Sequence, residues 1–148
     1  MNAEINETAN LLSLGLVFPT VVLGCVVIYT WFPAAKISIH KLEKDSNDWF
    51  ILGVCFGFLS AIIHNLYWFF FWVAQYIELD ITNELTAYGV IVNILTRQSM
   101  GIIAAYCHIK ASSKSSNRGS RSVNNLLVAC NLVGAALMLG FFLVKSIM

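Results

Sequence analysis

The sequence has 148 residues, of which 58% are hydrophobic and only 11% are charged. A soluble domain carries about 25% charged residues, and a chain of this length could not bury so much apolar surface. The sequence therefore predicts an integral membrane protein whose surroundings are the lipid bilayer, and the net charge of +1 gives no reason to expect a nucleic-acid partner.

Four stretches are long and apolar enough to cross a bilayer, for which about 20 residues are needed. They cover residues 11–35, 49–77, 85–109 and 123–147. The first ten residues contain Glu4 and Glu7 but no Lys or Arg, so they lack the basic start of a secretory signal, and the first stretch is expected to remain as a span. The sequence predicts an all-α fold, a single four-helix transmembrane bundle over residues 1–148 with up-down topology.

Three polar segments connect these stretches, at 36–48, 78–84 and 110–122. The first contains three Lys residues, the third contains four Lys or Arg residues, and the second contains none. Because segments rich in Lys and Arg stay on the cytoplasmic side, both termini are expected on the non-cytoplasmic side of a plasma or inner membrane. The Ser, Asn and Gly content of 110–122 also predicts that this segment lacks regular structure.

Pairs of small residues four positions apart occur in the predicted spans, and such pairs allow membrane helices to approach closely. The pairs that we expect to make helix contacts are Gly53 with Gly57, Gly101 with Ala105, and Ala136 with Gly140. Their partners are either the other helices of the same bundle or the helices of a second copy. The sequence leaves both alternatives open.

Six polar residues lie far from any connecting segment and form a predicted intramembrane polar site. They are His64, Asn65, Asn93, Arg97, Gln98 and Asn131. At about 1.5 Å per helical residue, His64, Arg97 and Asn131 fall roughly 15–24 Å from the predicted cytoplasmic ends of their spans, so these residues could meet near one level. Asn93 and Arg97 are four residues apart and therefore share a helix face.

Arg97 is the most costly of these residues to place in a membrane, at roughly 2.5–3.5 kcal/mol. No Asp or Glu lies within the four apolar stretches, so the chain offers Arg97 no ion-pair partner at that depth. Arg97 is either part of a hydrogen-bonded network that fixes the helices, or it binds an anion, a ligand or an acidic partner helix. His64 has similar alternatives: a neutral, hydrogen-bonded side chain, or one that transfers protons or contacts a ligand.

No cofactor or metal site is expected from the sequence. The other two histidines, His40 and His108, fall at the predicted cytoplasmic interface, so neither matches His64 in depth as a pair of haem ligands would. His108 is two residues before Lys110, and we interpret the two as a basic helix end near anionic lipid headgroups. The four cysteines lie in four different apolar stretches, which gives no redox or zinc motif.

Two hypotheses of function follow from this pattern, and neither is enzymatic because no nucleophile–base pair or metal-ligand set is visible. In the first, the bundle acts by association, as a homo-oligomer or as an accessory subunit of another membrane protein that carries an intramembrane acid. In the second, the polar residues line a small channel, a holin-like pore or a carrier. The second hypothesis requires a continuous polar path, whereas the first requires only a local cluster.

Overall fold

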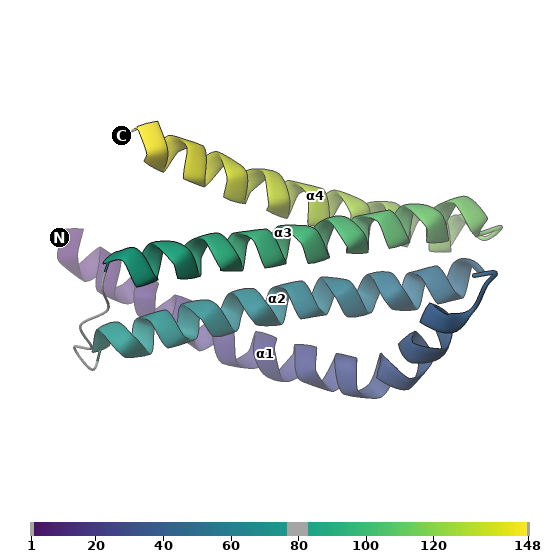
Figure 1. Ribbon diagram of the computed structural model, residues 1–148, viewed down its shortest axis with the longest axis horizontal. Coiled ribbons are helices and arrows are strands. Elements are labelled where there is room, and N and C mark those ends of the chain that lie inside the picture. Colours follow the sequence, from purple (N-terminus) through teal and green to yellow (C-terminus); the bar gives the residue numbers. More distant parts are fainter. Residues whose placement is uncertain (1, 77–82, 148) are drawn as a thin grey trace.

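The computed structural model describes residues 2–76 and 83–147, and this part of the chain is helical without any strand, which confirms the all-α prediction. Side chains are described at positions 15, 17–67, 69–70, 73–74, 89, 91–136 and 140. The helices are α1 (Asn2–His40), α2 (Ser46–Tyr76), α3 (Asn83–Lys114) and α4 (Arg118–Ile147). Successive helices run in opposite directions (Figure 1). Most of the acidic connection predicted at 78–84 lies outside the described residues.

The helices extend beyond the apolar stretches from which they were predicted. α1 continues to His40, and α3 continues to Lys114. The segment 110–122 is therefore mostly helical, and only residues 115–117 separate α3 from α4, so the prediction of irregular structure there was wrong. Contacts with α2 explain the difference, since the Ser46 hydroxyl of α2 donates to the Ala111 carbonyl near the end of α3 at 2.7 Å.

Side-chain caps fix where α2 and α4 begin. The Asn117 Oδ1 atom accepts hydrogen bonds from the amides of Gly119, at 2.8 Å, and Ser120, at 3.3 Å, which is the geometry of an N-cap. Before α2, the Asp48 amide donates to Asp45 Oδ1 at 2.8 Å, and the Asp45 amide donates to Asp48 Oδ2 at 3.1 Å. This reciprocal pair is a capping box, so a short connection between α1 and α2 is well defined.

The Asp48 carboxylate also ties the start of α2 to the end of α1. It accepts a hydrogen bond from the buried Ser38 hydroxyl at 2.8 Å and forms an ion pair with Lys41 at 2.7 Å. The hydrogen bond to Asp48 raises the pKa of the exposed Lys41 ammonium above its ordinary value. Lys114 of α3 donates to the Lys44 carbonyl, which brings the second short connection against the first.

The helices pack in chain order, with α1 on α2, α2 on α3 and α3 on α4. α2 and α3 run side by side through the centre, while α4 leans away from α3 toward its C-terminal end (Figure 1). The tightest buried core lies near the two short connections, where Ala35 of α1, Leu52 of α2 and Cys107 of α3 meet. α1 and α4 therefore each pack against only one neighbour extensively over the described residues.

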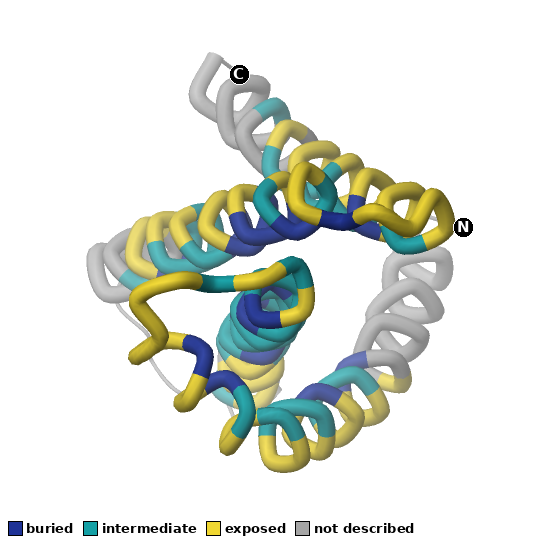
Figure 2. Tube along the Cα trace, turned by 90° about the vertical axis from the view of Figure 1, so that its right-hand side faces the viewer, coloured by how far each residue is buried: buried dark blue, intermediate teal, exposed yellow. Residues whose placement is uncertain are grey.

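Large apolar side chains remain exposed along all four helices, and Figure 2 shows exposed positions beside buried ones along the described trace. Examples are Phe18 and Tyr29 of α1, Phe70 of α2, Leu95 of α3 and Leu126 of α4. By length and composition, Val17–His40 and Ser46–Tyr67 could each cross a membrane; the first is mostly exposed, and the second is mostly half-buried. No window within the described residues of α3 or α4 meets the same criterion.

Candidate functional site

A small polar pocket lies where α2, α3 and α4 meet, halfway along the helices. Its volume is about 150 Å³, and it is lined by residues from all three helices. Gly57 and Ser60 come from α2, Arg97 and Gln98 from α3, and Asn131 from α4. Three of the six residues of the predicted polar site are therefore brought together in one pocket.

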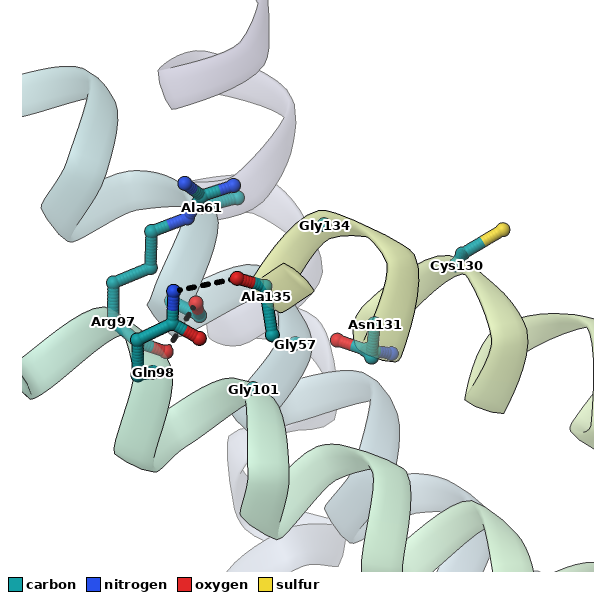
Figure 3. Close-up of a pocket in the computed structure, with 10 residues that line it drawn as sticks. Gly57, Ala61, Arg97, Gln98, Gly101, Cys130, Asn131, Gly134 and Ala135 are labelled. Atoms are coloured by element: carbon teal, nitrogen blue, oxygen red, sulfur yellow. Dashed lines mark hydrogen bonds between the residues drawn. The ribbon is translucent and has the colours of Figure 1, made fainter. Parts of the chain in front are cut away.

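The Arg97 guanidinium is the charged group of this pocket. Figure 3 shows its side chain extending from α3 toward Ala61 of α2. The Nη1 atom is buried and has no hydrogen-bond partner among the described residues. The only ion pair between described residues, Lys41 with Asp48, lies at the far end of the bundle. The positive charge of Arg97 is thus half-buried and unneutralised by the described part of the chain.

The other polar side chains of the pocket are oriented by backbone carbonyls. The Gln98 amide donates to the Ala135 carbonyl of α4 at 3.2 Å, and the Asn131 amide donates to the Leu127 carbonyl at 2.8 Å. The Ser60 hydroxyl of α2 donates to the Arg97 carbonyl at 3.0 Å (Figure 3). The first and third of these bonds join neighbouring helices, so they fix the register of α3 against α2 and α4.

Small residues create the space of the pocket. A Cβ atom added to Gly57 would lie 3.9 Å from Asn131 Oδ1, and one added to Gly134 would lie 3.9 Å from Arg97 Nη2. A Cβ atom added to Gly101 would lie 4.0 Å from Ser60 Oγ. These glycines therefore form walls at ordinary van der Waals distance, and larger side chains at the same positions would occupy the pocket.

Comparison with protein-family models, curated proteins and solved structures gave no match for this chain.

His64 and Asn93 form a second polar contact one helical turn from Arg97. The Asn93 Nδ2 atom lies 3.4 Å from His64 Nδ1, which makes that ring nitrogen the acceptor. Asn93 is 5% exposed, and its Oδ1 atom has no hydrogen-bond partner among the described residues. Asn65 stands apart from both groups, because its amide donates to the Ala61 carbonyl of its own helix at 2.8 Å.

A buried polar contact near the short connections was missed by the sequence analysis. His108 of α3 is 2% exposed, and its Nδ1 atom lies 2.9 Å from the Oδ1 atom of Asn124, which is 1% exposed. The interpretation of His108 as an interfacial basic residue was wrong, because its ring packs over Gly53 of α2 and against Phe50. Gly53 is the sequence signal for this contact, because only a glycine leaves room for the ring at that position. The sequence does not show which side chain of another helix fills that room.

The small-residue pairs differ in their surroundings. A Cβ atom on Gly53 would lie 2.7 Å from the His108 ring, so this glycine lies directly against α3. Gly101 and Ala105 are buried within the same set of helices. Ala136 is exposed, and nothing lies within 4 Å of a Cβ atom added to Gly140. Two of the pairs therefore lie against other helices of the chain, whereas the pair on α4 consists of an exposed alanine and a glycine with open space beside it among the described residues.

Proposed function

We propose that this chain is a multi-pass integral membrane protein that acts by lateral association, as an accessory subunit of a membrane complex. The observation that carries the proposal is the half-buried Arg97 guanidinium, whose Nη1 atom lacks a partner in the described structure. The competing form of the same proposal is a homo-oligomer. In neither form does the chain act by catalysis.

The exposed apolar surface supports the membrane part of the proposal. The exposed fraction is 73% for Phe18, 64% for Phe70, 63% for Leu95 and 64% for Leu126. These residues come from all four helices, so the apolar surface surrounds the molecule rather than forming one patch. A monomeric soluble protein rarely exposes apolar area on that scale, whereas lipid tails solvate it without penalty.

The distribution of basic residues supports the orientation with both termini on the non-cytoplasmic side. The seven Lys and Arg residues of the segments 36–48 and 110–122 lie at the end of the bundle that carries the two short connections. Ser116 lies exposed in the connection between α3 and α4. Basic residues beside membrane spans favour the cytoplasmic side.

This orientation predicts the labelling of single cysteines in intact cells. In a variant without the four native cysteines, Ser116→Cys should be protected from an impermeant maleimide, whereas Thr82→Cys, in the segment between α2 and α3, should be labelled. Permeabilised cells serve as the control, in which Ser116→Cys should react because this position is exposed. Labelling of Ser116→Cys together with protection of Thr82→Cys would invert the orientation, and labelling of both in intact cells would contradict four spans.

The charge balance of the spans favours an accessory subunit over a homo-oligomer. A second copy in the same orientation brings no Asp or Glu to the depth of Arg97, because the apolar stretches of the sequence contain none. An unpaired buried charge is strongly unfavourable, so the guanidinium requires a neutralising group from another molecule. A different membrane protein with an intramembrane acid supplies that group directly.

The surroundings of the pocket give less support to the alternative of a channel, a holin-like pore or a carrier. Between the pocket and the short connections, α3 presents Ala104, Ala105 and Cys107, which are all buried and apolar. Leu52 of α2 closes the same region. The described polar groups thus form separate clusters rather than a continuous path, as local association requires.

Association can be tested by purifying the chain from its native membrane in mild detergent. We expect a discrete complex heavier than the 16.4 kDa chain with its detergent, resolved by native mass spectrometry. Co-expression of two differently tagged copies distinguishes the two forms: copies that purify together indicate a homo-oligomer, and one copy with a second, different chain indicates an accessory subunit. A single chain without any protein partner, both in detergent and after reconstitution into nanodiscs from the native membrane, would contradict the proposal.

A further inference from the structure

We infer that the pocket around Arg97 is a carboxylate-binding site, and that it receives the Asp or Glu side chain of a partner's transmembrane helix. This inference rests on the proposed membrane function and names the chemistry of its contact.

The pocket contains a cationic hydrogen-bond donor and no negatively charged side chain. A guanidinium has five N–H groups, and no hydrogen bond of the Arg97 side chain is found among the described residues. Each amide group of Gln98 and Asn131 has two N–H groups and uses one of them on a backbone carbonyl. The Asn131 Oδ1 atom faces Gly57 (Figure 3), so the donor that the pocket offers to a ligand is the Arg97 guanidinium, which suits a group that accepts hydrogen bonds.

The charge of the site selects a monoanion. Arg97 is the one formally charged residue among those that line the pocket, and no carboxylate lies among them. A single negative charge would neutralise it, whereas a doubly charged phosphate would leave an uncompensated charge in a region of low dielectric. A carboxylate is a planar monoanion that accepts two parallel hydrogen bonds from a guanidinium, which makes it the best match for this group.

The depth of the site favours a protein side chain over a lipid headgroup. Arg97 lies thirteen residues before Lys110 on the same helix, which corresponds to about 20 Å along the helix axis. The carboxylate of a fatty acid belongs at the membrane interface, whereas an Asp or Glu on a spanning helix is held at such a depth. Cys130, which lines the pocket, is exposed, so the site has an approach from the outer surface of the bundle.

The test follows the Arg97 side chain directly by nuclear magnetic resonance in nanodiscs, after arginine is labelled with ¹⁵N and ¹³C. The chain contains three arginines, and the Arg97 signals are assigned by their loss in Arg97→Lys. The main probe is a Leu-rich transmembrane peptide with one central Asp, and the matched neutral probe has Asn at that position. Decanoate and decanol form a second pair, which presents the same chemistry on a lipid-like molecule.

We expect the Asp peptide to shift the Arg97 side-chain signals and the Asn peptide to leave them unchanged. Arg118 and Arg121 are exposed at the far end of the bundle and serve as controls in the same sample. Arg97→Lys keeps the charge but loses the planar pair of donors, so its affinity for the Asp peptide, measured by fluorescence energy transfer, should be about tenfold lower. A response to decanoate as large as the response to the peptide would contradict the inference that the carboxylate comes from a protein partner. It would leave the inference of a carboxylate-binding site in place.

Two glycine variants of α4 test whether the pocket itself is the site. Gly134→Leu should occupy the space next to Arg97 Nη2 and abolish the response to the Asp peptide. Gly140→Leu is the matched control, because nothing lies within 4 Å of its added Cβ atom, and it should keep the response. An unchanged Nε signal of Arg121, which donates to the Ser115 carbonyl at 2.9 Å, shows that the connection between α3 and α4 is folded in each variant. The Arg97→Lys comparison decides if Gly134→Leu does not fold.

Equal responses to Asp and Asn peptides, or no response of Arg97 to any carboxylate probe, would overturn the inference. The purified complex described above would still support association by another surface in that case. Conversely, a chain that purifies alone while Arg97 responds to the Asp peptide would contradict the proposed function but keep the carboxylate site.

Discussion

Replacing Gly53 with alanine should lower the free energy of unfolding by about 2 kcal/mol, even though alanine is the better helix former. The added Cβ atom would lie 2.7 Å from the Cε1 and Nε2 atoms of His108 and 2.9 Å from Nδ1. Contacts that short do not occur between real Cβ atoms and their neighbours, so either the ring or α2 must move. The ring cannot move freely because it is buried, it contacts Phe50, and it is hydrogen-bonded to Asn124.

Gly57 provides the matched control, since it is the second residue of the same small-residue pair on the same helix. A Cβ atom added there would lie 3.9 Å from Ala104 and Asn131, which is ordinary contact. Gly57→Ala should therefore change stability little or raise it slightly. Both variants can be compared by thermal unfolding in one detergent, followed by circular dichroism. A Gly53→Ala protein as stable as Gly57→Ala would show that His108 is not held as the structure describes.

Helix contacts could be predicted from the sequence only in part. The spacing of Gly53 and Gly57 identifies a helix face on which another helix can approach. It does not identify the partner or the distance, because these depend on which side chain of α3 reaches each glycine. Hydrophobicity predicted four helices in the right places. Their ends differ because caps such as Asn117, and hydrogen bonds between helices such as that from Ser46 to the Ala111 carbonyl, extend helices beyond their apolar stretches.

The polar site was also predictable only in part. Arg97, Gln98 and Asn131 could be grouped by their estimated depth, and the structure places them around one pocket. Depth alone could not separate Asn65, which points to the Ala61 carbonyl of its own helix. Nor could it indicate Ser60, because a serine in an apolar helix commonly bonds to its own backbone, whereas this one bonds to the Arg97 carbonyl across the helix interface.

Replacing Arg97 with methionine should raise the stability of the isolated chain by about 1–2 kcal/mol, which is the reverse of what a structural role predicts. Exchange of a buried, poorly paired charge for an apolar side chain of similar length is often stabilising, because the cost of removing the charge from water disappears. The Ser60 hydrogen bond should survive, since its acceptor is the backbone carbonyl of residue 97. Unfolding in detergent, monitored by circular dichroism, measures the difference.

Arg118→Met is the control for a general effect of removing a positive charge. Arg118 is exposed in the first turn of α4, so its replacement should change stability by less than about 0.5 kcal/mol. A loss of more than about 1 kcal/mol in Arg97→Met would contradict the prediction. The guanidinium would then stabilise the contact of α2, α3 and α4, and this result would contradict the inference that the pocket is a binding site.

The order of stabilities should reverse when a carboxylate partner is present. A ligand that binds only the folded state at one hundred times its dissociation constant stabilises that state by about 2.7 kcal/mol. The transmembrane peptide with a central Asp should therefore raise the stability of the native chain above that of Arg97→Met, which should gain nothing from the peptide. This reversal is expected of a residue that is retained for binding at the expense of stability. A residue retained for packing does not give it, because such a residue already makes its full contribution to stability in the chain alone.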